Sequence, residues 1–203
     1  MMRPIYVVTD PTARLSVADQ ARAIARGGAW AVQIRDKCAR DEDMAGLVAL
    51  LVLEMVALNV CLFVNDRLDL AIRTGAHGLH IGKGDGCPAE VRRRIGAQMI
   101  LGPSVETEAQ ARAMPSGFDY IGAGPIRATT TKPDHAAPIG IAGLARIVAA
   151  VCVLVYGIGG LVAGDAAAVK GAGAAGMAVV SAVVRSANPV LATRGLLSNW
   201  SAA

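Results

Sequence analysis

A regular alternation of short apolar β-type runs with helical patterns constrains the fold more than any other feature of this chain. Strands that alternate with helices favour parallel pairing, because each helix returns the chain across the sheet. Eight runs predict a single (β/α)8 TIM barrel over residues 1–203, and a doubly wound open sheet is the alternative. The runs are Ile5–Thr9, Ala31–Arg35, Cys61–Asn65, Gly78–Ile81, Met99–Ser104, Tyr120–Gly122, Val153–Gly157 and Met177–Val180.

Helical patterns occupy the intervals between these runs. Only 3% of the residues are aromatic although 54% are hydrophobic, so the core must consist mainly of Ala, Val, Leu and Ile, as in other α/β folds. The clearest helical patterns are Ser16–Arg26, Asp41–Leu58, Glu106–Met114, Ile141–Ala149, Gly164–Lys170 and Pro189–Trp200.

Polar residues follow the ends of the predicted strands. In a TIM barrel the catalytic residues lie just after the strand carboxyl ends, so we expect these residues to form one ring. Gln33, Arg35 and Lys37 end the second run, Asn65 and Asp66 end the third, Asp85 lies in the loop after the fourth, Ser104 closes the fifth, Thr129, Thr131 and Lys132 follow the sixth, Gly159 and Gly160 follow the seventh, and Ser181 follows the eighth.

Gln33, Arg35 and Lys37 are spaced so that their side chains share one face of a strand. One amide and two cations therefore converge, and two fixed cations suit a pyrophosphate. The alternative is a polar strand edge that faces water.

Two glycine-rich segments have different expected roles. Residues 171–176 match G-x-G-x-x-G, but they follow a helix and precede a strand, whereas a dinucleotide fingerprint needs the opposite context. We therefore expect a helix C-cap and a tight turn there. Residues 157–160 follow the seventh strand, where barrels commonly hold phosphate, so they predict a phosphate cradle, with a plain turn as the alternative.

Asp66 and Asp85 are candidate ligands for Mg²⁺, an ion that takes one or two carboxylates and fills its octahedron with water and substrate phosphate. Asp66 could instead cap the helix that begins near Asp69. His77, His80 and His135 lack metal-ligand spacing, so structural or surface roles are expected. No persuasively spaced Ser-His-Asp or Cys-His set and no Walker A motif occurs.

Charge and cysteine usage bound the partners and the compartment. A net charge of +4 and an isoelectric point near 9.1 suit small anionic substrates better than nucleic acid. The four cysteines show no C-x-x-C spacing, so no disulfide framework is implied and a reducing cytoplasm is expected. Cys61 and Cys152 lie in apolar runs and are expected to be buried. Glycines and polar residues interrupt the two longest apolar stretches, which argues against a membrane span.

Several motifs occur together in the order found in one family. The chain resembles thiamine-phosphate synthases, within the wider group that includes TenI-type thiazole tautomerases. The motifs are Tyr6-Val7-Val8-Thr9-Asp10, Gln33-Ile34-Arg35-Asp36-Lys37, Asn65-Asp66-Arg67, His80-Ile81-Gly82 with Asp85, Gly102 with Ser104, Gly124-Pro125-Ile126 with Thr129 to Asp134, and Gly157-Ile158-Gly159-Gly160.

The resemblance implies a transferase that joins 4-amino-2-methyl-5-hydroxymethylpyrimidine diphosphate to hydroxyethylthiazole phosphate, with Mg²⁺ required. The products would be thiamine phosphate and pyrophosphate. By the same resemblance, Gln33 and Ser104 would bind the aminopyrimidine. The other roles implied are diphosphate binding by Arg35, Lys37, Asn65 and Lys132, metal binding by Asp66 and Asp85, and contact with the thiazole phosphate by Thr129, Thr131, Gly159, Gly160, Val180 and Ser181. Lys132, Arg35 and Ser104 are the expected catalytic residues.

Some positions depart from the family pattern. Arg127-Ala128 replaces an aromatic-Pro pair, Lys83-Gly84 replaces Gln-Glu, His77 replaces Asp, and Glu106 stands where His is frequent. Two alternatives remain at this stage: a TenI-type tautomerase, and a non-catalytic protein of the same fold that binds a phosphorylated ligand. The sequence predicts small-molecule substrates, with no nucleic-acid or membrane partner, and leaves the oligomeric state open.

Overall fold

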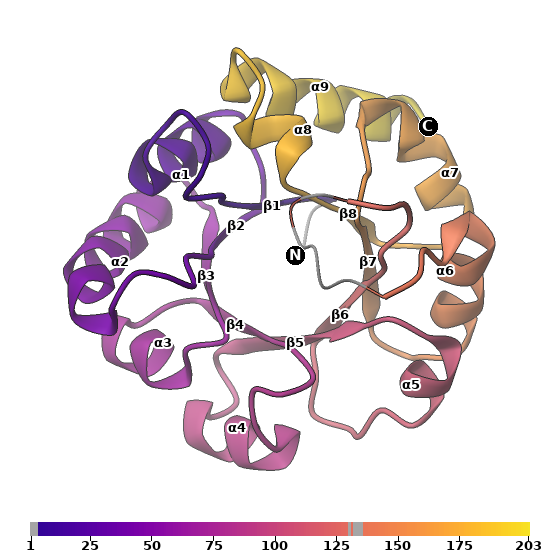
Figure 1. Cartoon of the computed structure of the whole chain (residues 1–203), viewed down its shortest axis with the longest axis horizontal. Coiled ribbons are helices and arrows are strands. Elements are labelled where there is room, and N and C mark those ends of the chain that lie inside the picture. The colour runs from indigo at the N-terminus through magenta and orange to yellow at the C-terminus, as the bar shows by residue number, and fades with distance from the viewer. Residues whose placement is uncertain (1–3, 130, 132–135) are drawn as a thin grey trace.

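The computed structural model describes residues 4–129, 131 and 136–203, and these residues form a closed barrel of parallel strands surrounded by helices (Figure 1). Neighbouring strands follow chain order, and β1 pairs with β8 to close the sheet. The predicted TIM barrel is therefore confirmed, and the open-sheet alternative is wrong. The strands are β1 (Ile5–Val8), β2 (Ala31–Ile34), β3 (Cys61–Asn65), β4 (Gly78–Ile81), β5 (Ile100–Val105), β6 (Tyr120–Ala123), β7 (Leu154–Ile158) and β8 (Gly176–Val179).

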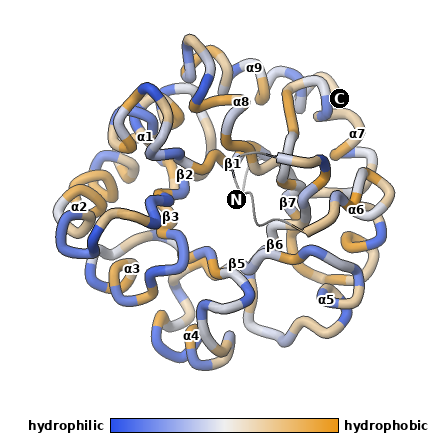
Figure 2. The backbone as a smooth tube through the Cα atoms, in the orientation of Figure 1, coloured by the Kyte–Doolittle hydropathy of each residue, from blue (hydrophilic) through white to orange (hydrophobic). Residues whose placement is uncertain are grey.

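The helices form an outer ring around the strands, and most of them carry both hydrophobic and hydrophilic residues (Figure 2). A helix with one face on the barrel and one in water needs this composition. Within the described part of the chain they are α1 (Val17–Arg26), α2 (Asp41–Ala57), α3 (Leu68–Thr74), α4 (Pro88–Ile95), α5 (Glu108–Arg112), α6 (Gly140–Ala149), the 3₁₀ turn η1 (Ala163–Asp165), α7 (Ala166–Gly171), α8 (Ser181–Val184) and α9 (Pro189–Ala202).

Local sequence explains where several helices begin. Ser16 caps α1 by accepting a hydrogen bond from the Asp19 N–H, and Thr107 and Gln110 form a capping box at α5. Pro88 and Pro189 stand at first-turn positions, where a missing N–H costs nothing. The predicted helices lie within a few residues of these bounds.

The barrel interior contains a cluster of large aromatic rings. Three tyrosines, two phenylalanines and two tryptophans occur in the chain, and five of these seven residues lie in one cluster. The interior of a narrow barrel must be filled by side chains. A few large aromatic side chains can fill the space that many aliphatic side chains would otherwise occupy. The cluster consists of Tyr6, Trp30, Phe63, Tyr120 and Tyr156, whose neighbouring ring centroids lie 5.1 to 6.1 Å apart.

Glycines in the strands make room for these rings. A Cβ on Gly102 would lie 2.1 Å from Cε1 of Tyr120, and a Cβ on Gly78 would lie 2.2 Å from Cε1 of Phe63. Neither ring can yield easily, because both side chains are fully buried. Strand glycines are thus a packing requirement of the aromatic interior.

We expect Gly102→Ala to destabilise the protein by about 1–3 kcal/mol, as overpacking of a closely packed core does. Urea unfolding followed by circular dichroism measures this change. Gly46→Ala is the matched control, because its new Cβ would meet no atom within 4 Å apart from the adjacent backbone of its own helix, and alanine favours helix α2. Equal stability of Gly102→Ala and wild type would contradict the packing argument.

The glycine-rich segment 171–176 and the two cysteines that were expected to be buried can also be compared with the structure. The glycines of residues 171–176 end α7 and begin β8, with Gly173 at a positive φ of 84°, so the predicted helix-to-strand turn is confirmed. The expected burial of Cys152 is wrong: Cys152 is exposed in the link before β7, while Cys61 is half-buried. Among the described residues no helix is long and apolar enough to cross a membrane.

Candidate active site

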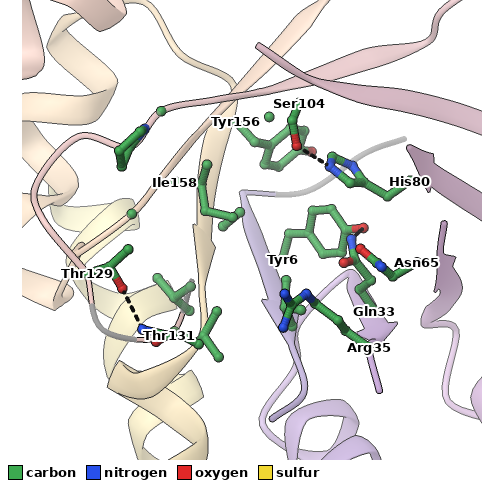
Figure 3. A pocket seen from close by; sticks show the side chains of 18 of the residues that line it. Tyr6, Gln33, Arg35, Asn65, His80, Ser104, Thr129, Thr131, Tyr156 and Ile158 are labelled. Carbon is green, nitrogen blue, oxygen red and sulfur yellow. Dashed lines mark hydrogen bonds between the residues drawn. The ribbon is translucent and has the colours of Figure 1, made fainter. Parts of the chain in front are cut away.

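A cavity of about 190 Å³ opens at the carboxyl ends of the strands. Side chains from several strands point into it (Figure 3). The structure thereby brings together nearly all residues singled out from the sequence, and Lys132 lies outside the described residues. Those that line the cavity are Gln33, Arg35, Lys37, Asn65, Asp66, Asp85, Ser104, Thr129, Thr131, Gly159, Gly160, Val180 and Ser181.

The end of β2 is fixed from both sides. The Thr9 hydroxyl donates to the Gln33 carbonyl oxygen at 3.2 Å and accepts from the Arg35 N–H at 3.0 Å. The Gln33 side chain is buried, and its Nε2 donates to the Tyr6 hydroxyl at 2.6 Å. These bonds hold Gln33 and Arg35 at the cavity, as their shared strand face predicted.

Arg67 fixes the loop that carries Lys37. Its guanidinium donates to the Asp36 carbonyl oxygen at 2.5 Å and to the Asp41 carboxylate at 2.6 Å. The Asp36 carboxylate in turn accepts from the N–H groups of Cys38 and Ala39. A loop tied at this many points can present a lysine to a ligand at little cost in ordering entropy.

Asp66 and Asp85 form an acidic pair at the same rim. Burial, and then the nearby charge of Asp85, raises the pKa of the Asp66 carboxyl above its ordinary value, although Lys37, Arg67 and Arg35 oppose the shift. Asp85 Oδ2 accepts from the Gly82 N–H at 2.6 Å. Two carboxylates that repel each other beside a cavity have the charge and the hard oxygen donors that suit a divalent cation.

Asp66 adopts a left-handed backbone conformation, with φ of 54°, and its N–H donates to the His80 carbonyl oxygen at 2.8 Å. Such a conformation is unfavourable outside glycine and persists where the surroundings enforce it, commonly at functional sites. Arg67, not Asp66, is the N-cap residue of α3, and no side chain caps that helix. The alternative that Asp66 serves as a helix cap is therefore wrong.

The raised pKa of Asp66 predicts a pH-dependent gain in stability for Asp66→Asn in metal-free buffer. Because the folded-state pKa lies above the unfolded value, ionisation of Asp66 costs the folded state free energy as pH rises through the folded pKa. The variant should therefore unfold at a higher temperature than wild type at pH 7. This advantage should disappear below pH 3.8, the ordinary value. Thermal unfolding at both pH values measures the difference, and a less stable variant at pH 7 would contradict it.

Gly159 and Gly160 have two structural reasons to be glycine. Both have positive φ, 99° and 66°, and a Cβ would lie 2.6 Å from Cβ of Pro125 and 2.8 Å from Cβ of Arg127, respectively. The turn after β7 thus packs closely beneath the loop after β6. Among the described residues, the N–H groups of Gly159 and Gly160 donate no hydrogen bond. Both groups are therefore available to a ligand.

Arg127, a departure from the family pattern, ties these two loops together. Its guanidinium forms a two-point ion pair with the Asp165 carboxylate, with both N···O distances at 2.6 Å, and donates to the Gly160 carbonyl oxygen at 3.2 Å. The Arg127 guanidinium holds the pKa of the Asp165 carboxyl below its usual range. Replacement of an aromatic residue by Arg127 therefore leaves the loop anchored by other means.

The cavity floor contains residues that the sequence reasoning missed as site residues. Tyr6, Tyr120 and Tyr156 line it, and burial raises the pKa of each phenol, so all three stay neutral. His80 also lines the cavity, and its Nε2 lies 3.0 Å from the Ser104 hydroxyl (Figure 3). The expected structural role fits His77, whose Nδ1 accepts from the Leu62 N–H. It does not describe His80.

Strand register was the signal that could have found His80. In the barrel His80 pairs with Gly102, and Ser104 lies two residues farther along β5 on the same face. Inward-facing positions at neighbouring strand ends meet at one rim. Alignment of the eight predicted strands as neighbours in a barrel would therefore have placed His80 beside Ser104.

The chain matches the family model described as thiamine monophosphate synthase over residues 5–183. The chain belongs to this family. A thiamine-phosphate synthase of Roseiflexus sp. (strain RS-1) is 46% identical over 95% of this chain and 83% of its own length. That of Chloroflexus aurantiacus is 43% identical over 95% of this chain and 90% of its own length.

One solved structure agrees with the family, and a more distant one supports only the fold. A thiamine phosphate pyrophosphorylase from Pyrococcus furiosus superposes with a TM-score of 0.89 at 32% identity, covering 98% of this chain and 96% of that one. A 3-hexulose-6-phosphate synthase superposes with a TM-score of 0.72 at 14% identity, which supports the barrel fold alone.

Proposed function

We propose that this chain is a thiamine-phosphate synthase that condenses the aminopyrimidine diphosphate with the thiazole phosphate. One observation carries the proposal: a single cavity combines fixed cations and an acidic pair on one side with an open glycine turn on another. Cations with carboxylates suit a diphosphate and its metal, and free N–H groups suit a second phosphate. Two phosphorylated substrates fit this arrangement.

In this proposal the diphosphate binds Arg35, Lys37 and Asn65, with Lys132 as a further cation inferred from the sequence. Asp66 and Asp85 would hold Mg²⁺; burial and then the charge of Asp85 raise the pKa of the Asp66 carboxyl, and a cation would relieve both effects, which supports this role. When bound, the ion would neutralise charge on the leaving pyrophosphate. Gln33 and Ser104 would hold the pyrimidine ring.

The thiazole phosphate would bind on the opposite side of the cavity. The cavity lining there includes the turn after β7, the start of α8, and the two described threonines of the loop after β6. The residues that would surround this phosphate are Thr129, Thr131, Gly159, Gly160, Val180 and Ser181.

The reaction then needs positioning and charge stabilisation. The bond between the pyrimidinylmethyl carbon and the pyrophosphate oxygen breaks with its electron pair on oxygen, and the amino-substituted ring delocalises the resulting cation. The thiazole nitrogen attacks that carbon and forms the new C–N bond. Arg35 and Lys37 stabilise the departing charge, while Gln33 and Ser104 orient the ring. Orientation of two bound reactants can contribute up to roughly 7–11 kcal/mol in favourable cases.

Incubation of the purified protein with both substrates and Mg²⁺ tests the proposal directly. We expect equal amounts of thiamine phosphate and pyrophosphate, measured by chromatography and a coupled phosphate assay. Binding of both substrates without any product would instead support the non-catalytic alternative. The strands of the one barrel extend from Ile5 to Val179, so we also propose that the chain acts as one catalytic domain. We further propose that it acts on small molecules and in the cytoplasm.

We expect no acceleration of thiazole aromatisation by tautomerisation, the reaction of the rival reading. Glu106 lines the cavity where the tautomerases carry His. Incubation of the purified protein with the non-aromatic thiazole tautomer, followed by ultraviolet absorbance, measures this rate. A robust rate that is lost in Glu106→Gln would reverse the order of the two readings, because it would identify Glu106 as the general base.

A further inference from the structure

Four side-chain hydrogen bonds connect Gln33 on β2 with Ser104 on β5 through the cavity floor. Gln33 Nε2 lies 2.6 Å from the Tyr6 hydroxyl, which lies 3.2 Å from the Tyr120 hydroxyl. His80 Nδ1 lies 2.8 Å from the Tyr120 hydroxyl, and His80 Nε2 lies 3.0 Å from the Ser104 hydroxyl. These five residues are called the relay below.

The donors and acceptors of the relay must all point the same way. Each phenol has one proton, and neutral imidazole donates from one nitrogen and accepts at the other. Because Gln33 Nε2 donates to Tyr6, the Tyr6 proton is available to Tyr120, and the Tyr120 proton to His80 Nδ1. The His80 proton then resides on Nε2 and is donated to Ser104.

This direction defines the two ends that a ligand meets. One N–H of Nε2 is donated to Tyr6 and a second N–H remains, while the Gln33 carbonyl oxygen Oε1 is the acceptor that the amide offers to a ligand. At the other end the Ser104 oxygen accepts from His80, so its own proton is left to donate. One end of the relay therefore accepts and the other donates.

The direction of the hydrogen bonds in the relay, and with it the accepting and donating ends, is difficult to reverse. Reversal requires the Gln33 amide to turn over and all four hydrogen bonds to reverse together. Gln33, Tyr6 and Tyr120 are only 3%, 2% and 0% exposed, so water cannot easily replace a hydrogen bond that is lost among them. The part of the relay from Gln33 to Tyr120 is buried and connected, and a buried polar network of this kind specifies one arrangement.

We infer that Tyr6, Tyr120 and His80 are positioning residues that determine specificity for a 4-aminopyrimidine over its 4-oxo counterpart. The inference rests on the proposed function. An aminopyrimidine presents an N–H donor beside a ring nitrogen acceptor, and this pattern matches an accepting Gln33 and a donating Ser104. The 4-oxo ring presents a carbonyl oxygen beside a ring N–H, which places acceptor against acceptor and donor against donor.

Tyr6→Phe and Tyr120→Phe test this role, because each removes one hydroxyl of the relay and keeps the ring. Steady-state kinetics with the 4-amino and 4-oxo pyrimidine diphosphates give a ratio of two kcat/KM values. In either variant the Gln33 amide can turn, so this ratio should fall at least about tenfold relative to wild type. The double variant should lose no more discrimination than either single variant, since both break the same connection.

Tyr156→Phe is the matched control. Tyr156 belongs to the same aromatic cluster and lines the cavity, but it takes part in none of the four relay hydrogen bonds. Its ratio of kcat/KM values should stay within about twofold of wild type. Thermal unfolding of all variants checks that the barrel is intact.

The outcomes separate the inference from the function on which it rests. A wild type that makes thiamine phosphate, with Tyr6→Phe and Tyr120→Phe variants that fold and keep the full preference for the amino substrate, would overturn the relay and leave the proposed function standing. A wild type that binds both substrates without product would overturn the proposed function instead.

Discussion

Removal of Mg²⁺ by excess chelator should lower kcat by about 10³-fold or more. A bound divalent ion supplies several kcal/mol of charge stabilisation in reactions of this kind, and about 1.4 kcal/mol corresponds to a factor of ten in rate. The leaving pyrophosphate carries more negative charge than two cations can neutralise. Arg35 and Lys37 alone are therefore not sufficient to stabilise it. Kinetics with defined free Mg²⁺ measure the effect.

Asp66→Ala and Asp85→Asn should show the same loss at low Mg²⁺ and should partly recover at high Mg²⁺, because each variant keeps one of the two carboxylates. Asp43→Asn is the matched control: Asp43 pairs with Arg40 at the exposed start of α2 and does not line the cavity. Full turnover in excess chelator would rule out the metal, and unchanged Mg²⁺ dependence in both variants would rule out these ligands.

The barrel could be predicted from the sequence because strand and helix periods are local properties. β3 and β4 have the predicted bounds, and the other strands differ by one residue at one or both ends. Strand ends depend on hydrogen bonds to neighbouring strands, such as that from the Thr9 N–H to the Gln33 carbonyl oxygen at the end of β1, and the local sequence pattern does not reveal these bonds.

The cavity residues could be predicted because a barrel places strand carboxyl ends at one rim. Gln33, Asp66 and Ser104 meet there for this reason alone. The relay could not be predicted in the same way. It depends on the depth of Tyr6 and Tyr120 in the barrel, and that depth depends on tertiary packing against residues such as Gly102.

Cys152 shows the opposite error. Its apolar neighbours predicted burial, but it lies in the link between α6 and β7, where Val153 and Leu154 precede the fully buried part of the strand. Apolar runs that begin before a strand enters the barrel are exposed at the amino-terminal rim. Hydropathy alone does not mark that point of entry.

Lys132→Ala should lower kcat by roughly 10²–10³-fold and raise KM much less, if Lys132 acts as one preorganised electrostatic donor to the departing pyrophosphate. Lys132 lies outside the described residues, and its expected role rests on the sequence: it directly follows Thr131, which lines the cavity. Charge on the leaving group grows as the bond breaks, so a cation there stabilises the transition state more than the bound substrate. Steady-state kinetics with saturating thiazole phosphate separate the two parameters.

Lys132→Arg should restore activity only in part, because a planar guanidinium needs a different space from an ammonium group even though the charge is kept. Lys170→Ala is the matched control, since it removes the same charge from the exposed end of α7, where the lysine contacts Trp200 and not the cavity. If the loss in Lys132→Ala came from net charge, Lys170→Ala would reproduce it. If Lys132→Ala kept wild-type kcat and kcat/KM, Lys132 would be a surface residue, and Arg35 and Lys37 would have to hold the diphosphate with the acidic pair and its metal.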